Sequence, residues 1–144
     1  MAVKPVPEGY HTVTPYLTVP DVAQELEFLK TAFHAQVVEA METPNGIMHA
    51  DVLIGDSHVM MGMAGGQWPA RPGTLYLYSD DCDALYRAAM AAGATSLREP
   101  TNEFYGDRSA GVTDPQGNQW WFATHVEDVS PEEMQRRAAE LGRG

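Results

Sequence analysis

The segment Thr14-Pro15-Tyr16-Leu17-Thr18-Val19-Pro20-Asp21 is matched, 60 positions later, by Thr74-Leu75-Tyr76-Leu77-Tyr78-Ser79-Asp80-Asp81. Both segments alternate with a period of two, which is typical of a half-buried β-strand. In the first copy, one face carries Val13, Leu17 and Val19, and the other carries Thr14, Tyr16 and Thr18. An internal repeat of this kind predicts two modules with the same architecture.

Each predicted strand runs directly into a predicted helix. Asp21 is placed to cap the first helix, and Asp81 is placed to cap the second. The first helix has an apolar stripe at helical spacing, formed by Val22, Leu26, Leu29 and Phe33. Gly93 suits the left-handed residue that ends the second helix. Residues 35–39 and 95–99 align at the same offset, so we expect a further strand after each helix.

Three strands are expected after each helix. In the first half we predict them at roughly 36–43, 47–54 and 57–64, and in the second half at roughly 95–100, 108–113 and 118–125. Ser130-Pro131-Glu132-Glu133 has the composition of a helix start. We therefore predict a single domain, 1–144, whose parts are module one at about 9–65, a linker at 66–72, module two at about 73–126, and a C-terminal helix at about 130–141.

The composition is that of an acidic protein large enough to bury a core. The chain has 144 residues, 44% of them hydrophobic, and a formal net charge of −11. Such a charge repels phosphate groups, which argues against nucleic acid and anionic membranes as partners, but it attracts cationic small molecules. Because neither a membrane-spanning run nor a signal peptide is recognisable, we expect a cytoplasmic protein. The single cysteine, Cys82, excludes an intramolecular disulfide.

The tandem βαβββ pattern and the segment Asp114-Pro115-Gln116-Gly117-Asn118 before Trp120 resemble the vicinal oxygen chelate superfamily, which includes glyoxalases, bleomycin-resistance proteins and dioxygenases. Residues 104–108 (Phe-Tyr-Gly-Asp-Arg) and 125–128 (His-Val-Glu-Asp) resemble its PhnB-like branch. The resemblance covers nearly the whole chain. It implies an α+β fold in which two tandem βαβββ modules form a cupped mixed sheet, followed here by a C-terminal helix. It also implies a homodimer.

The resemblance places the metal-ligand positions of the enzyme branches at Thr14, about Met61, Thr74 and Trp121. A hydroxyl, a thioether and an indole do not supply the basic lone pair or the charge that imidazole and carboxylate ligands supply. Glutamate is absent from 43–98 and from 104–125, so a shift of register does not restore the ligand. We therefore expect neither a metal ion nor a cofactor.

The same positions predict the lining of a ligand pocket. If Thr14 and Thr74 point into the cup, strand alternation sends Tyr16, Tyr76 and Tyr78 there as well. By the same parity we assign Met61 and Trp121 to the cup. Trp68 lies either over its mouth, as an aromatic platform, or at an interface as an anchor. Tyr105 belongs to a predicted loop at the cavity mouth, and Arg108 begins the strand that follows this loop and faces the cavity. The predicted ligand-binding residues are Thr14, Tyr16, Met61, Trp68, Thr74, Tyr76, Tyr78, Tyr105, Arg108 and Trp121. The alternative is a cup filled by these side chains.

Two sets of polar residues leave other chemistry open. His49 and His58 lie on neighbouring predicted strands, where they form either a general-base or ligand pair or hydrogen-bonded surface. Arg108 either clamps an anionic group of a ligand or forms a structural pair with Asp107.

These observations favour a metal-independent small-molecule-binding protein, similar to bleomycin-resistance proteins, that sequesters an aromatic or cationic compound and thereby gives antibiotic resistance. The main alternative is a lyase, isomerase or dioxygenase of the same superfamily with a rearranged active site. A structural or interaction module is the third possibility, if the cup is filled. Neither the ligand nor any reaction is identified by the residues.

Overall fold

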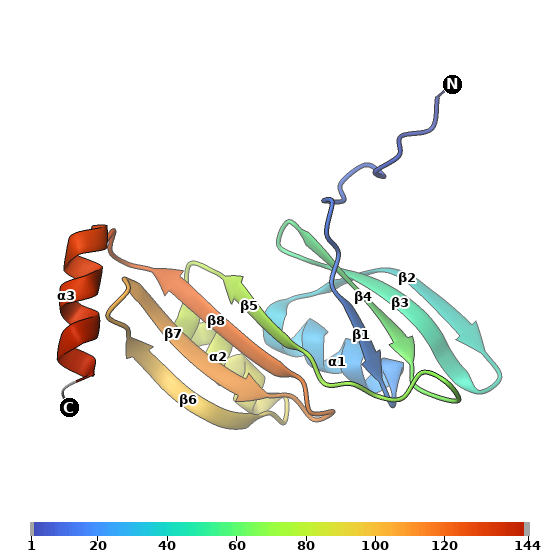
Figure 1. The fold of residues 1–144 in the computed structure, drawn as a ribbon. Helices are drawn as coiled ribbons and strands as arrows, with labels where there is room; N and C mark the ends of the chain where they lie inside the picture. Colours follow the sequence, from blue (N-terminus) through green and yellow to red (C-terminus); the bar gives the residue numbers. More distant parts are fainter. Residues whose placement is uncertain (1, 143–144) are drawn as a thin grey trace.

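The computed structural model describes residues 2–142, which form eight strands and three helices (Figure 1). We call the first half module one, and it comprises β1 (Tyr16–Val19), α1 (Val22–Phe33), β2 (Gln36–Thr43), β3 (Gly46–Ile54) and β4 (Ser57–Met63). We call the second half module two, and it comprises β5 (Thr74–Tyr78), α2 (Cys82–Ala91), β6 (Thr95–Asn102), β7 (Asp107–Thr113) and β8 (Gln119–His125). Helix α3 (Pro131–Leu141) follows.

Each module builds one four-stranded mixed sheet, with strand order β1-β4-β3-β2 in module one and β5-β8-β7-β6 in module two. The first and last strands of each module pair in parallel, and the other pairs are antiparallel. The predicted α+β fold with two βαβββ modules and a C-terminal helix is therefore confirmed. Strands β1 and β5 are the edge strands that the two sheets turn toward each other (Figure 1).

The helices begin and end where the sequence predicts. The Asp21 side chain accepts a hydrogen bond from the Gln24 amide at 3.1 Å, and Asp81 accepts one from the Ala84 amide at 3.0 Å. Gly93 has a φ of 102°, the left-handed conformation that ends the second helix. Each carboxylate thus satisfies an amide that has no partner inside its own helix.

One apolar core extends through both modules. Helices α1 and α2 lie together behind the two sheets (Figure 1), and Phe33 at the end of α1 packs against two aromatic rings of β8. Its ring centroid lies 5.2 Å from that of Trp120 and 5.6 Å from that of Phe122. Both β8 residues are buried. The modules therefore share buried surface and are not independent units.

A polar contact fastens the modules at the turn between β7 and β8. The side-chain amide of Gln116 donates to the Asp21 carbonyl at 2.7 Å and to Glu25 Oε1 at 3.1 Å, and its oxygen accepts from the Asp21 amide at 2.7 Å. Asp114 accepts from the Trp120 indole at 2.9 Å. Burial, with Asp114 nearby, raises the pKa of Glu25 to about 9. Glu25 is therefore a neutral acid near pH 7.

Helix α3 stands apart from the rest of the fold (Figure 1). Ser130 caps it by accepting from the Glu133 amide at 3.2 Å, as the sequence predicts. Arg137 ties it to module two through Glu127, at 2.8 and 2.9 Å, and through the Phe104 carbonyl at 3.1 Å. None of the residues described in α3 is buried.

Candidate functional site

A cavity of about 840 Å³ opens between the two modules. It is lined by the segment before β1, the end of α1, the β3–β4 turn, β5 and the start of α2. Its apolar lining includes Phe33, Leu75, Leu77 and Trp120. A hollow of this size with a largely apolar lining is typical of a small-molecule site.

The ionisable residues around the cavity are acids and histidines. Three aspartates, Asp56, Asp80 and Asp81, line it together with His11, His34 and His58. Within residues 2–142, no lysine or arginine lines it. The cavity therefore has a negative field unless its histidines are protonated, and this field favours a cationic or neutral ligand over an anion.

Two tyrosines of β5 connect the cavity to a buried carboxylate. Tyr76 and Tyr78 line the cavity, and their hydroxyls donate to Asp107 Oδ2 at 2.8 and 3.0 Å. His125 Nδ1 lies 2.9 Å from the other oxygen, Asp107 Oδ1. Asp107 is 3% exposed and lies on β7, which is separated from β5 by β8. The two phenols therefore reach across β8 to a buried carboxylate that holds them in place. We call these four residues the Asp107 cluster.

Within the Asp107 cluster, the carboxyl group of Asp107 is held in its charged form. Burial opposes ionisation of Asp107, but the hydrogen bonds from His125, Tyr76 and Tyr78 outweigh it and hold its pKa below the ordinary value. Burial and the bond to Asp107 raise the pKa of Tyr76, and the bond to Asp107 raises that of Tyr78. The contacts with Asp107 and Asp128 raise the pKa of His125. Both phenols therefore remain protonated donors at neutral pH.

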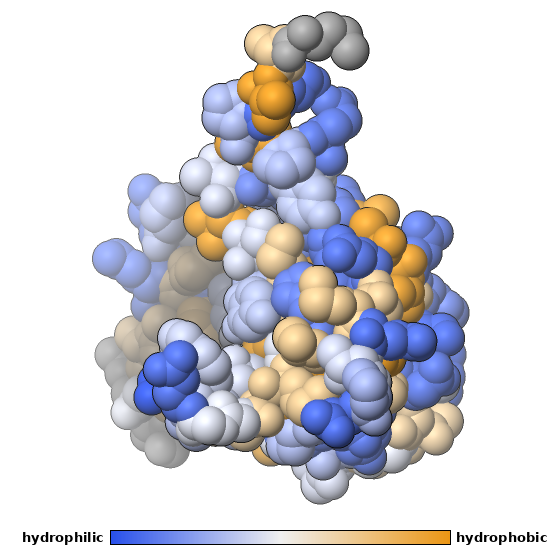
Figure 2. Space-filling model, turned by 90° about the vertical axis from the view of Figure 1, so that its right-hand side faces the viewer, coloured by the Kyte–Doolittle hydropathy of each residue, from blue (hydrophilic) through white to orange (hydrophobic). Residues whose placement is uncertain are grey.

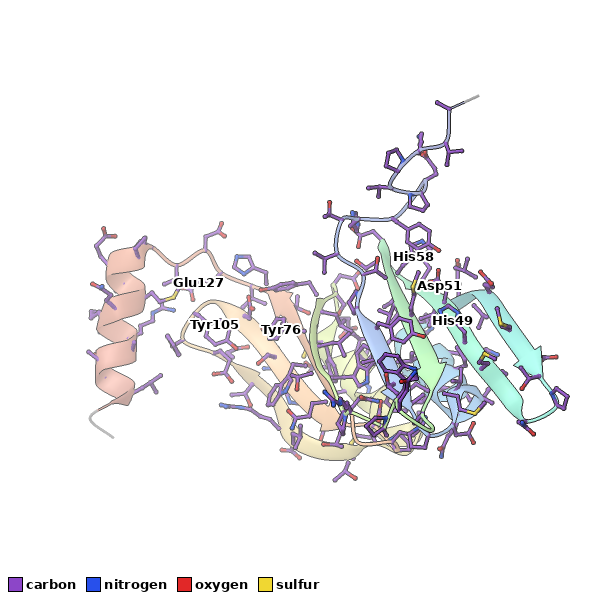
Figure 3. The ribbon with its side chains drawn as sticks, turned by 45° about the vertical axis from the view of Figure 1, so that its right-hand side comes forward. His49, Asp51, His58, Tyr76, Tyr105 and Glu127 are labelled. Atoms are coloured by element: carbon purple, nitrogen blue, oxygen red, sulfur yellow. The ribbon has the colours of Figure 1, made fainter. Side chains whose placement is uncertain are left out.

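A second buried carboxylate lies in module one. His58 Nδ1 is 2.9 Å from Asp51 Oδ1, and the Tyr10 hydroxyl donates to Asp51 Oδ2. The Tyr10 ring stacks on the His58 ring with centroids 3.8 Å apart. Figure 3 shows His58 and Asp51 side by side, with His49 further along β3. Of the two alternatives for His49 and His58, the structure does not bring the two side chains together, because His49 lies against Tyr16 with ring centroids 5.7 Å apart.

Three of the ten predicted ligand-binding residues line the cavity, namely Thr14, Tyr76 and Tyr78. The strand register places Tyr16, Thr74 and Trp121 on the same sheet faces as these tyrosines, but they do not line the cavity. Tyr105 lies beside Tyr76 at the end of module two (Figure 3). Trp68 is 66% exposed in a tight turn of the linker, away from the cavity.

The assignment of Met61 to the cup face is wrong. Met61 is fully buried and lies beside Leu17 in the β1–β4 register, so it faces the helices. The turn between paired residues is one residue longer in module two than in module one. Four residues separate Leu53 from its partner His58, whereas five separate Thr113 from its partner Gln119. The 60-residue offset therefore becomes 61 in the last strand, and the counterpart of Trp121 is Met60.

The placement of Arg108 at the cavity entrance is also wrong. Its guanidinium binds Asp83 on α2, with Nε–Oδ1 at 2.7 Å and Nη2–Oδ2 at 3.1 Å. Arg108 therefore joins the helix to the sheet, and its structural partner is Asp83 rather than the predicted Asp107. The two neighbours point to opposite faces of β7, as alternation along a strand requires.

Asp51 and Tyr10 are site residues that the sequence did not reveal. A signal for Asp51 exists, because a single aspartate interrupts an otherwise apolar run, Ala50-Asp51-Val52-Leu53-Ile54. A buried charged residue of this kind needs hydrogen-bond partners, which Tyr10 and His58 supply. The part of the chain that the structure describes contains no group of three or more His, Cys, Asp or Glu arranged to hold a metal ion. No helix in that part has the length and apolar character to cross a membrane.

Comparison with known proteins agrees with this architecture. Residues 10–122 match the family model of the Glyoxalase/Bleomycin resistance protein/Dioxygenase superfamily. An uncharacterised protein of Mycobacterium tuberculosis strain H37Rv is 31% identical over an alignment of 144 positions. The alignment covers 92% of this chain and 85% of that protein.

Two solved structures share the fold. TioX from Micromonospora sp. ML1 has a TM-score of 0.71 at 21% identity, covering 81% of this chain and 99% of TioX. TnmS3, an antibiotic-binding protein from Streptomyces sp. CB03234, has a TM-score of 0.66 at 20% identity, covering 88% of this chain and 99% of TnmS3. With the family match, the repeated modules and the observed strand order, the chain belongs to the glyoxalase/bleomycin resistance protein/dioxygenase superfamily.

Proposed function

We propose that the protein binds a small aromatic or cationic compound in the cavity between its modules, without a metal ion. The observation that carries this proposal is the lining of the cavity. An apolar floor, two tyrosines and three aspartates surround a volume of about 840 Å³, and no lysine or arginine from residues 2–142 joins them. A cation with an apolar body can pack against the apolar floor and is attracted by the tyrosine rings and the aspartates. An anion is repelled by the aspartates.

The Asp107 cluster strengthens the attraction for cations. A phenol that donates a hydrogen bond to a carboxylate gains electron density on its ring. The face of the ring then attracts a positive charge more strongly. Tyr76 and Tyr78 both donate to Asp107, and their rings meet edge to face with centroids 5.4 Å apart. A cation in the cavity therefore meets two polarised rings with a buried negative charge behind them.

Sequestration is the role that we propose for this binding. TnmS3, which has the same fold, is an antibiotic-binding protein. Antibiotic resistance, a cytoplasmic location and membership of the PhnB-like branch remain our predictions. The enzyme alternative, a lyase, isomerase or dioxygenase with a rearranged site, is supported by one contact, that between His58 and Asp51.

We also propose a homodimer. Strand β2 leaves Val37, Val38 and Met41 at 42%, 52% and 48% exposure, and apolar and hydrophilic residues mix on this side of module one (Figure 2). A partner subunit covering these side chains and the exposed strand edges would remove apolar surface from water. Light scattering on the purified protein should give twice 15.8 kDa. A mass of one chain at micromolar concentration would contradict the dimer.

Fluorescence titration with a planar cationic dye, ethidium, tests the binding proposal, and the anionic dye anilinonaphthalene sulfonate provides the comparison. We expect saturable ethidium binding that weakens by roughly 2- to 13-fold in Tyr78→Ala, because an aromatic or cation contact contributes about 0.5 to 1.5 kcal/mol. Tyr16→Ala is the matched control, since Tyr16 and Tyr78 are similarly exposed, at 55% and 63%, but only Tyr78 lines the cavity.

A charge test separates the cavity from the overall charge of the chain. The double variant Asp56→Asn/Asp80→Asn removes two acids of the cavity, and Glu42→Gln/Glu99→Gln removes two exposed acids elsewhere. Both lower the net negative charge by two. Ethidium binding should weaken by about threefold or more only in the cavity variant. Equal binding by both double variants, or equal loss in Tyr16→Ala and Tyr78→Ala, would refute the proposed site.

A further inference from the structure

We infer that His58 and Asp51 form a general-base pair that activates water toward an activated ester or lactone held in the cavity. This inference goes beyond ligand binding, although it uses the same cavity. His58 lines the cavity, whereas Asp51 is 2% exposed and lies behind it.

The contacts of Asp51 fix the tautomer of His58. The Tyr10 hydroxyl donates to Asp51 Oδ2, so Asp51 Oδ1 remains to accept a proton from His58 Nδ1, 2.9 Å away. Neutral imidazole carries a proton on only one nitrogen. When Nδ1 holds that proton, Nε2 bears the basic lone pair. His58 Nε2 has no hydrogen-bond partner among residues 2–142.

The ring is also held in one orientation. Tyr10 stacks on His58 at 3.8 Å and is itself anchored to Asp51, so the three side chains restrain one another. The His58 side chain is 10% exposed. His58 borders the cavity and is held by a carboxylate, and its second nitrogen has no hydrogen-bond partner among the described residues. This is the arrangement that general-base catalysis requires. Asp51 and Tyr10 are positioning residues in this arrangement.

Water is the partner that suits this base. Among the possible enzyme nucleophiles, the Ser57 hydroxyl donates to Asp56 at 2.8 Å, and Cys82 lies buried against the Phe122 carbonyl. Nε2 would take a proton from water as the water oxygen bonds to the carbonyl carbon. The carbon–oxygen bond to the leaving group then breaks, and the imidazolium returns the proton to the departing oxygen. The balance is water plus ester giving acid plus alcohol.

The charge of the cavity defines the substrate class. No lysine or arginine from the described residues lines it, so a developing oxyanion receives no cationic stabilisation. Asp56, Asp80 and Asp81 also repel anionic substrates. The reaction therefore favours neutral or cationic esters and lactones whose carbonyl is already activated by a good leaving group.

Hydrolysis of para-nitrophenyl acetate by the 144-residue protein tests the inference. We expect His58→Gln to lower the rate by about tenfold or more, since a positioned base contributes roughly 100- to 10,000-fold in enzymes and less on an unoptimised probe. His49→Gln is the matched control, because His49 lies on β3 outside the cavity and has no carboxylate contact among the described residues. Its rate should equal that of the original protein. Equal rates for His58→Gln and His49→Gln would overturn the inference.

Asp51→Asn provides a second variant that keeps the imidazole. The Asn oxygen can still accept from Tyr10, so its amide nitrogen would donate to His58 Nδ1 and force the proton onto Nε2. The rate should fall about as far as in His58→Gln, and the ring nitrogen chemical shifts of His58 should show the opposite tautomer. If Asp51→Asn hydrolyses the ester at the rate of the original protein although the tautomer of His58 is reversed, the inference is overturned.

The solvent isotope effect and dye binding complete the test. Proton transfer to His58 predicts a slower rate in deuterium oxide, whereas an unchanged rate with accumulation of acetyl-imidazole would show direct nucleophilic attack and overturn the general-base role. Ethidium binding should persist in His58→Gln. If ethidium fails to bind the original protein while ester hydrolysis depends on His58, the binding proposal fails and the catalytic inference stands.

Discussion

Replacing Glu25 by glutamine should stabilise the protein at neutral and alkaline pH. Glu25 is 1% exposed, and its Oε2 has no hydrogen-bond partner among residues 2–142. Its pKa is about 9 in the folded protein, against an ordinary value of 4.5. Between these values the folded chain holds a proton that the unfolded chain releases. The free energy of unfolding is therefore highest below pH 4.5 and falls as the pH rises toward 9.

The magnitude follows from the same two values. One pKa unit corresponds to about 1.4 kcal/mol, so a group that remains protonated from pH 4.5 to about pH 7 lowers the free energy of unfolding by up to about 3 kcal/mol. A glutamine side chain has nearly the shape of the neutral acid but does not ionise. The Glu25→Gln protein should therefore be about 1 to 3 kcal/mol more stable than the original near pH 7, and the difference should vanish near pH 4.5.

Urea unfolding followed by tryptophan fluorescence between about pH 5 and about pH 8 measures this difference, because Trp120 lies in the core beside Asp114. Glu27→Gln is the matched control on the same helix, where the Glu27 side chain is 72% exposed and pairs with Lys30. It should retain the pH dependence of the original protein. If Glu25→Gln retains it as well, Glu25 is not the buried neutral acid described above.

Three further outcomes test other parts of the structure. In Gly111→Ala, the added Cβ would lie 2.5 Å from the Trp121 ring, so we expect a loss of roughly 1 to 3 kcal/mol in urea unfolding. In Asp107→Asn, the pKa of His125 should fall, because the contact with the Asp107 carboxylate is the largest cause of its elevation; titration by nuclear magnetic resonance measures it. In Arg108→Leu, thermal unfolding should occur at a slightly lower temperature while ethidium binding is unchanged, because Arg108 binds helix α2 rather than the cavity.

The sequence predicted the fold well because its signals are local and repeated. Strand alternation and the two aspartate caps are each visible in a short segment, and the 60-residue offset shows that both modules repeat the same elements. The same offset caused the error at Met61. A one-residue difference in turn length reverses the face of every later residue in the strand, and that difference is visible only when the pairing of Leu53 with His58 is known.

The candidate site was harder to predict because its contacts join distant segments. Tyr10 reaches Asp51 across 41 positions, and Tyr76 reaches Asp107 across 31. Alternation correctly assigned Tyr76 and Tyr78 to one face, but it does not show which carboxylate their hydroxyls bind. The choice of Asp83 as the partner of Arg108 likewise depends on how α2 lies on the sheet.

The β3–β4 turn and the β7–β8 turn occupy equivalent places in the two modules, but among the described residues only the β7–β8 turn is bound to the other module. Gln116, in the longer turn of module two, is held by the start of α1, whereas Gly55 and Asp56, in the shorter turn of module one, border the cavity. We therefore expect a ligand to enter and leave the cavity on one side, beside Gly55. Changes in the length of that turn would alter the size of the entrance, and with it the rate of exchange, while the fastened end preserves the volume within.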